Sequence, residues 1–340
     1  MDVTDLLRRA VLAGASDLHL AAGESPLLRV DGELQRLACP AVPADALERA
    51  LTGLLDAAQR ERWGAGDELD LALSLPALGR FRLNLYRQRS GPALSARVIA
   101  TQVPDVDHLG LGDVFQGIAQ CRDGLVLVAG ATGSGKSSTL AALLGRLNRE
   151  QPLHIVTLED PIEFIHSSQS GLVSQREVGV HSRDFAQGLR SALRQDPDVI
   201  MIGELRDLES IRLALRAAET GHLVLATVHT RSAASCVDRL VDVFAAEEKP
   251  LVRAMLAESL RVVVAQVLVR RKGGGRVAAR EVLVATPAVR NLIREGRMAQ
   301  LPSIMQAGAA QGMRTLEGAM QALQAQGLVA DHNHKRHGML

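Results

Sequence analysis

Aromatic residues are scarce in this chain: its 340 residues include one Trp, one Tyr and five Phe. A hydrophobic core must therefore be built mainly from Leu, Val, Ile and Ala. The apolar fraction of 47% and the charged fraction of 23% are ordinary for a soluble globular protein. Because one domain usually takes about 100 to 200 residues, the length favours two domains.

Cysteines are also few, and Cys39, Cys121 and Cys236 lie far apart. This spacing argues against a disulfide framework and against a CxxC zinc site, and it fits a reducing compartment. Apolar runs stay well short of the roughly 20 residues that a membrane-spanning helix needs. The N-terminus lacks the order of a signal peptide. We therefore expect no direct insertion into a membrane, and any membrane role to be peripheral.

Long basic runs are missing as well, and the net charge is +1. A nucleic-acid-binding surface usually requires clustered Lys and Arg. The charge balance therefore predicts no nucleic-acid partner and disfavours a DNA translocase.

The first 100 residues predict a small α+β domain. Residues 2–14 have the pattern of a short amphipathic helix, and residues 43–63 that of one helix that begins near a Pro. Short strands bounded by turn residues are expected at 17–20, 27–30, 32–37, 68–75, 79–88 and 93–100.

A linker is expected at 101–112, and the pattern then changes. Continuous apolar runs at 124–130, 153–160, 198–204 and 222–229 alternate with helical patterns. This alternation indicates a parallel sheet covered by helices on both faces, so the fold class is α/β. From about residue 246 the pattern is mainly helical, with one hairpin around 270–276, and residues 331–340 are expected to form a flexible tail.

The segment GATGSGKS at 130–137 matches the phosphate-loop pattern G-x-x-x-x-G-K-[ST], between a strand and a helix. In such loops backbone amides wrap phosphate oxygens. Lys136 is expected to reach the β- and γ-phosphates of ATP, and the Ser137 hydroxyl to bind Mg²⁺. The predicted nucleotide-binding residues are Gly130, Ala131, Thr132, Gly133, Ser134, Gly135, Lys136, Ser137 and Ser138.

Acidic residues gather where the next two apolar runs end, and ligands bind at this edge of a parallel sheet. ATP hydrolysis requires a group that orients water and acceptors that hold the metal and its waters. Glu163 and Glu204 are therefore the predicted catalytic acids, and Glu204 is also a predicted metal ligand, directly or through water. Glu159 and Asp160 are assigned coupling or structural roles. Helix capping is the alternative for these acids.

His222 and His229 bracket the fourth apolar run. They are seven residue steps apart, about 23 Å along a strand, so only His229 can reach the phosphate edge of its own subunit. His229 is predicted to sense the γ-phosphate, with a buried structural histidine as the alternative. His222 is predicted to have a structural or coupling role.

Seven segments together resemble a known family. They are ASDLHL (15–20), GRFRLN (79–84), GATGSGKSSTLAALL (130–144), TLEDPIEF (157–164), ALRQDPDVIMIGELRD (192–207), AAETGHLVLATVHT (217–230) and NLIREGRM (291–298). In this order they closely resemble the secretion-superfamily ATPases, and specifically the PilT-like type IV pilus retraction motors. The resemblance covers about residues 4–328.

The resemblance implies a PAS-like N-terminal domain at 1–100 and a RecA-like ATPase domain at 113–330, assembled as a homohexameric ring. It implies ATP hydrolysis that powers pilus retraction and twitching motility, and catalytic arginines Arg82 and Arg97 that reach ATP. The implied location is cytoplasmic, peripheral at the cytoplasmic face of the inner membrane. The implied partners are the inner-membrane platform protein of the pilus machine and, as an option, a related retraction ATPase.

Some positions depart from the family pattern. Ala131 replaces a common Pro, Ser138 replaces a common Thr, Ala245 stands where Pro is usual, and the last helix lacks the usual Tyr.

An assembly-type pilus or type II secretion ATPase is one alternative function. Such chains usually carry a longer N-terminal region and a four-cysteine zinc insertion, and neither pattern is seen in this sequence, which favours retraction. A PilU-like accessory retraction motor stays open as an alternative. An ATP-dependent scaffold without turnover is disfavoured by the acids and the histidine at the phosphate edge.

Overall fold

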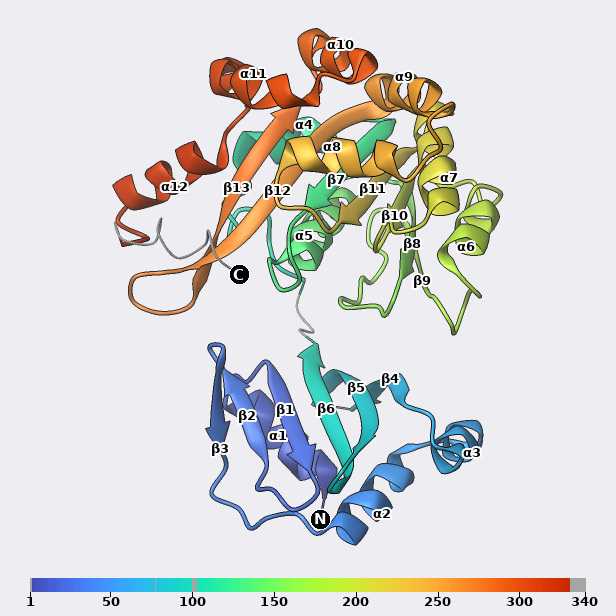
Figure 1. Ribbon diagram of the computed structural model, residues 1–340, viewed down its shortest axis with the longest axis vertical. Helices are drawn as coiled ribbons and strands as arrows, with labels where there is room; N and C mark the ends of the chain where they lie inside the picture. The colour runs from blue at the N-terminus through green and yellow to red at the C-terminus, as the bar shows by residue number, and fades with distance from the viewer. Residues whose placement is uncertain (1, 77, 100–102, 331–340) are drawn as a thin grey trace. The chain divides into compact units, whose positions relative to one another are not determined.

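The computed structural model describes residues 2–76, 78–99 and 103–330 (Figure 1). Its contacts divide the chain into two compact units, Met1–Gln102 and Val103–Leu340. The predicted tail at 331–340 and part of the predicted linker lie outside the described residues. Within the described ranges, no helix is both long and apolar enough to cross a membrane.

The first unit is built on an antiparallel sheet with the strand order β3-β2-β1-β6-β5-β4. All six predicted strands are present, and Asp31 and Gly32 form the tight turn between β2 and β3 with φ values of 48° and 90°. Positive φ at both turn residues is typical of a two-residue hairpin loop. The strands are β1 (Asp17–Ala21), β2 (Leu27–Val30), β3 (Glu33–Arg36), β4 (Leu69–Leu75), β5 (Gly79–Gln88) and β6 (Gly91–Ile99).

Three helices accompany this sheet: α1 (Val3–Leu12), α2 (Ala44–Leu54) and α3 (Ala57–Ala65). The prediction of one helix at 43–63 was therefore wrong. Asp56 interrupts it, because its side chain accepts a hydrogen bond from Gln59 N while Gln59 Oε1 accepts one from Asp56 N. This reciprocal capping box starts a new helix and satisfies two backbone donors at its first turn.

The second unit contains a seven-stranded sheet with the order β13-β12-β7-β11-β10-β8-β9. Neighbouring strands are parallel except β12 and β13, which form an antiparallel hairpin. The strands are β7 (Gly124–Ala129), β8 (His154–Glu159), β9 (Leu172–Glu177), β10 (Val199–Ile202), β11 (Leu223–Val228), β12 (Leu260–Arg270) and β13 (Arg276–Val284).

Helices cover both faces of this sheet, as predicted. Along β7, Val126 and Val128 face α4 (Gly112–Ala119) and α5 (Lys136–Glu150). Leu125 and Leu127 face the opposite side, where α7, α8 and α9 pack. Every side chain of β7 is buried, which explains why its sequence is continuously apolar. The other helices are α6 (Phe185–Ala192), α7 (Leu208–Glu219), α8 (Ala233–Asp242), α9 (Lys249–Ser259), α10 (Pro287–Glu295), α11 (Leu301–Ala307) and α12 (Leu316–Ala325).

One strand of this sheet was not predicted, and another is longer than expected. The hairpin around 270–276 is present, but the expectation of a mainly helical region missed the length of β12, which pairs with β7 in the sheet. A short apolar run cannot be assigned to helix or strand by periodicity alone. The missed strand is β9, which lies at the edge of the sheet and has only partly buried side chains over most of its length.

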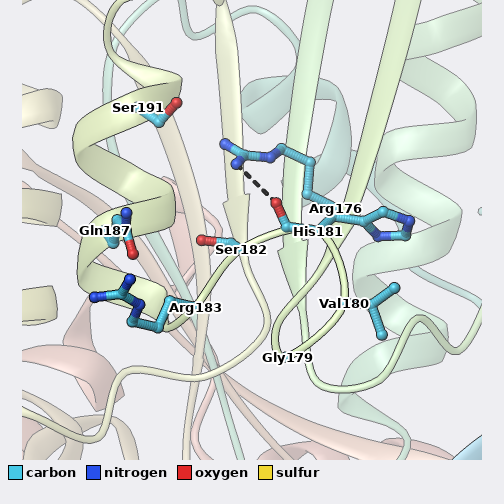
Figure 2. A pocket seen from close by; sticks show the side chains of 8 residues that line it. All are labelled: Arg176, Gly179, Val180, His181, Ser182, Arg183, Gln187 and Ser191. Carbon is cyan, nitrogen blue, oxygen red and sulfur yellow. Dashed lines mark hydrogen bonds between the residues drawn. The ribbon is translucent and has the colours of Figure 1, made fainter. Parts of the chain in front are cut away.

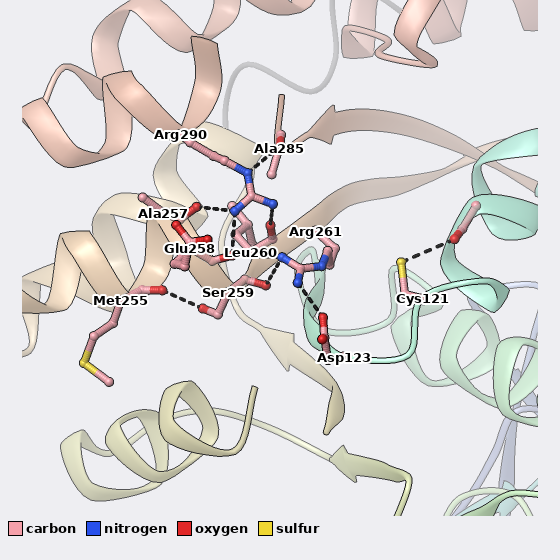
Figure 3. Close-up of polar contacts among 11 residues, drawn as sticks. Cys121, Asp123, Met255, Ala257, Glu258, Ser259, Leu260, Arg261, Ala285 and Arg290 are labelled. Atoms are coloured by element: carbon pink, nitrogen blue, oxygen red, sulfur yellow. Dashed lines mark hydrogen bonds and ion pairs between the residues drawn. The ribbon is translucent and has the colours of Figure 1, made fainter. Parts of the chain in front are cut away.

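Arginine side chains fasten the C-terminal helices to the sheet (Figure 3). Arg290 of α10 donates to Ala257 O and Leu260 O at the end of α9, at 2.7 and 3.2 Å. Arg261 at the start of β12 donates to Glu258 O at the end of α9 at 2.8 Å and forms an ion pair with Asp123, which precedes β7. Carbonyls at a helix C-terminus lack intrahelical donors, so these guanidinium groups satisfy acceptors that would otherwise stay open.

Candidate active site

The phosphate loop connects β7 to α5, as its sequence pattern requires. Gly130 has a φ of 153°, and a Cβ atom there would lie 2.3 Å from Ser134 Oγ and 2.6 Å from Gln266 O. Only glycine fits this space. Gly135 begins helix α5 from a left-handed conformation with a φ of 87°, which glycine adopts without steric cost.

Lys136 is the buried cation of the loop, with 8% of its surface exposed. Its Nζ donates to Gly130 O and Ala131 O at 2.8 and 3.0 Å. Burial lowers the pKa of Lys136, while the charges of Glu204 and Glu163 act in the opposite direction. The two predicted catalytic acids are therefore close enough to interact electrostatically with the loop lysine.

Glu204 lies just beyond β10 and is held from both sides. Gly203 N donates to Leu158 O of β8, and Leu205 N donates to Thr227 O of β11. The carboxylate contacts Arg206 at 2.6 Å. These backbone bonds fix the direction of Glu204 through the two neighbouring strands.

His229 follows β11 and its Nε2 lies 3.2 Å from Glu204 Oε2. Burial would raise the pKa of Glu204, but the hydrogen bond from Arg206 and the nearby His229, Arg206 and Lys136 lower it below its ordinary value. Glu204 is therefore an ionised acceptor at neutral pH. The structure thus brings together the loop lysine, one predicted acid and the predicted sensor histidine.

The loop after β8 carries Glu163, which is exposed. Glu159 is buried instead: it accepts hydrogen bonds from Thr157 Oγ1 at 2.6 Å and from Gln175 Nε2 at 3.0 Å. Burial raises the pKa of Glu159. Glu159 is therefore fixed by neighbouring side chains, whereas Asp160 is exposed at the start of the loop. The coupling or structural roles of both residues stay predictions.

The edge strand β9 holds this loop, which the sequence patterns did not indicate. Gln175 Nε2 donates to Phe164 O at 2.8 Å, and Gln175 Oε1 accepts from His166 N at 2.7 Å. Glu177 accepts from Ile162 N at 3.1 Å. The backbone on both sides of Glu163 is therefore fixed by side chains of β9. The polar residues of β9 were the only sign of this role in the sequence. Only the pairing of β9 with β8 shows that their side chains contact the Glu163 loop.

The other histidine of the fourth run lies at the opposite end of β11. This strand pairs regularly with β7 from Leu223 to Val228, so His222 and His229 are separated by its whole length. His222 Nδ1 lies 3.1 Å from Ala217 O, near the end of α7. The structural or coupling role of His222 stays a prediction.

Arg82 and Arg97 belong to the first unit, where they are direct partners on β5 and β6. Like charges opposite each other on a sheet are unfavourable. Each arginine pairs with an acid: Arg82 Nε with Asp70 at 3.0 Å and Arg97 Nε with Asp17 at 2.9 Å. Their contact with ATP stays a prediction.

The oxygen ligands near the loop fit Mg²⁺. Ser137 lies in the first turn of α5, and Glu204 supplies a carboxylate. Within the described residues no three His, Cys, Asp or Glu side chains gather as a metal cluster. Mg²⁺ usually takes one or two protein ligands and completes its shell with phosphates and water. The residues present therefore suit a metal bound together with a nucleotide.

A separate pocket lies between β9 and α6 (Figure 2). It has a volume of about 420 Å³ and contains none of the predicted site residues. Its Arg176 donates to His181 O and Gly188 O at 3.1 and 3.3 Å. This arginine braces the turn before α6. The lining residues are Arg176, Gly179, Val180, His181, Ser182, Arg183, Gln187 and Ser191.

Comparison with known proteins places the chain in a family. The profile for "Type II/IV secretion system protein" matches residues 1–274. The type IV pilus retraction ATPase PilT of Pseudomonas aeruginosa is 49% identical over 98% of this chain and 97% of its own length. A twitching motility protein of Neisseria gonorrhoeae is 46% identical over 98% of this chain and 90% of its own.

A crystal structure of the pilus retraction motor PilT with bound ADP has the same fold, with a TM-score of 0.88 and 38% identity. It covers 97% of this chain and 95% of the other. Sequence motifs, fold and near-complete coverage agree, so the chain belongs to the type II/IV secretion system ATPases and, within them, to the PilT-like type IV pilus retraction ATPases.

Proposed function

We propose that this ATPase hydrolyses ATP at the loop of residues 130–137 and powers type IV pilus retraction and twitching motility. One observation carries the proposal: a complete phosphate loop follows β7, while Glu204 and His229, which lie 3.2 Å apart, follow the adjacent parallel strands β10 and β11. Binding and hydrolysis groups therefore meet at one edge of the sheet.

The residues of this edge have separate tasks. Loop amides and Lys136 hold the β- and γ-phosphates of ATP, since both present donors to anionic oxygens. Ser137 and Glu204 hold Mg²⁺, which would neutralise the charge that develops on the phosphates. Glu163 and Glu204 orient the attacking water. His229, whose Nε2 lies 3.2 Å from Glu204 Oε2, senses whether the γ-phosphate is present.

Assembly completes the site in this proposal. Six copies form a ring, and Arg82 and Arg97 of one subunit reach the nucleotide of its neighbour. Asp70 and Asp17 hold these arginines within their own sheet, which limits the side-chain entropy lost when they bind phosphate. The motor acts in the cytoplasm on the platform protein at the inner membrane.

Deletion of the gene tests this function in the cell. We expect surface pili to accumulate while twitching stops, because extension continues without retraction. A plasmid copy should restore twitching, and the same plasmid with Lys136→Ala should not. Loss of pili after deletion would instead indicate an assembly ATPase.

Mixed rings test whether the arginines act across a subunit boundary. Lys136→Ala and Arg97→Ala subunits are each expected to be inactive alone. Mixed rings should regain part of the ATPase activity, because some boundaries combine an intact loop with an intact arginine. Steady-state ATP turnover of co-assembled, differently tagged subunits measures this.

The mixing experiment needs proof of co-assembly, which tandem affinity purification through both tags supplies. A second pair, Lys136→Ala with Glu204→Gln, is the matched control. Both changes lie in the same unit of the chain, so a single subunit must carry both groups and no rescue is expected. Absence of rescue in proven Lys136→Ala and Arg97→Ala rings would contradict an arginine acting in trans.

Alanine variants of His222 and His229 should lose different properties of the protein. His229→Ala should lower turnover while the ring persists, because the reacting end loses a polar contact. His222→Ala should reduce thermal stability or coupling more than ATP affinity, since its imidazole contacts the end of α7. ATP affinity, turnover, melting temperature and ring mass separate the two. Identical changes in all four measurements would refute the assignment by strand geometry.

A further inference from the structure

Gln266 is a buried amide directly under the phosphate loop, although it lies 130 positions or more beyond most of that loop in the sequence. Its side chain belongs to β12 and is 2% exposed. The preceding residue, Ala265, pairs with Ala129, the last residue of β7. Gln266 therefore lies beside Gly130, where the phosphate loop begins.

The amide of Gln266 makes two hydrogen bonds, both to the loop and its helix. Nε2 donates to Ser134 O at 2.7 Å, and Oε1 accepts from Thr139 Oγ1 at 2.9 Å. Ser134 and Thr139 are themselves only 6% and 1% exposed. One side chain thus ties the middle of the loop and the first turns of α5 to the sheet.

The bond to Ser134 O also sets the direction of the next amide. A trans peptide is planar, and its C=O and N–H groups point in opposite directions. Because Ser134 O points at Gln266, the N–H of Gly135 points away from the sheet. Gly135 has a φ of 87°, and glycine tolerates many backbone conformations, so the sequence alone would let this peptide rotate.

We propose that Gln266 is a positioning residue for nucleotide binding, which fixes the loop amides in the orientation that receives the phosphates. The inference rests on the proposed function, namely ATP binding at this loop. The residue touches neither phosphate nor metal. It acts through the Ser134–Gly135 peptide and through Thr139.

Gln266→Leu tests the proposal, because leucine keeps the apolar bulk and removes both hydrogen bonds. The Kd of a fluorescent ADP analogue and the KM for ATP should each rise at least tenfold. The kcat should change less than threefold, because phosphate contacts present in both ground and transition states affect KM alone. The melting temperature without nucleotide should also fall, because buried Ser134 O and Thr139 Oγ1 lose their partner, and the increase produced by ADP should shrink.

Two further variants separate positioning from packing. Thr139→Val removes one partner and leaves the bond to Ser134 O, so a smaller rise in the Kd, about threefold, is expected. Val264→Ala removes buried volume from the same strand without touching the loop. It should lower the melting temperature and leave the Kd for the ADP analogue unchanged.

The Kd values of these variants decide whether Gln266 acts by positioning the loop. A Kd within twofold of wild type for Gln266→Leu, or an equal rise for Val264→Ala, overturns the proposal. Should Gln266→Leu fail to fold, Gln266→Asn and Thr139→Val decide by the same criteria. Wild type is measured in the same assay, so failure of the wild-type chain to bind the ADP analogue would overturn the proposed function itself.

Discussion

Lys136→Ala is expected to reduce ATP turnover to background. Lys136 is the fixed cation of the phosphate loop, and its ammonium group is buried with only loop carbonyls as hydrogen-bond partners among the described residues. Removing it takes away the fixed ammonium charge that contacts the β- and γ-phosphates, where negative charge moves during transfer. Release of inorganic phosphate by the purified ring measures the loss.

Folding has to be controlled in this experiment, because Lys136 also bonds to Gly130 O and Ala131 O. Circular dichroism and ring mass should match those of wild type. Lys272→Ala is the matched control, since it removes the same group from the exposed hairpin turn and should keep full turnover. Activity of Lys136→Ala within about twofold of wild type would show that hydrolysis occurs elsewhere.

Glu204→Gln should leave ATP bound and nearly unhydrolysed, with kcat reduced 10²-fold or more, the scale typical of a general base. Glutamine keeps the shape and can still accept a hydrogen bond from Arg206. It lacks the negative charge that holds metal-bound water and the attacking water. Single-turnover hydrolysis together with ATP affinity separates the chemical step from binding.

Glu317→Gln on α12 is the control for this change, because it removes an exposed carboxylate that has no role at the phosphate edge. Its turnover should equal that of wild type. Loss of ATP binding by a folded Glu204→Gln protein would make Glu204 mainly a binding residue. Since the pKa of Glu204 lies below its ordinary value, lowering the pH from 8 to 6 should not reproduce the effect of the mutation.

Local patterns were sufficient for the parts of the site that lie close together in sequence. The phosphate loop is one continuous segment, and its glycines have the conformations that the motif requires. The core strands of the parallel sheet are fully buried, so they appear as uninterrupted apolar runs. Strand ends also follow from these runs, so the sequence alone predicts that Glu204 and His229 lie at the same edge, where they are 3.2 Å apart.

Features that depend on pairing between distant segments were missed. β9 is a partly polar edge strand, so no periodicity marked the side chains of Gln175 and Glu177 that hold the Glu163 loop. The break before Asp56 was missed because a capping box competes locally with an otherwise helical pattern. Likewise, nothing in the sequence around Arg82 and Arg97 showed that Asp70 and Asp17 neutralise them.

The sequence by itself thus determined the phosphate loop, the core of the sheet and the edge at which the acids lie. These features depend on residues within a few positions of each other, or on burial, which requires apolar residues and is therefore visible in the sequence. Only the tertiary structure decided which polar groups fix those residues in place. Gln266 is the clearest case. Its amide can bond to Ser134 O only because β12 pairs with β7, and this pairing brings Gln266 under the loop.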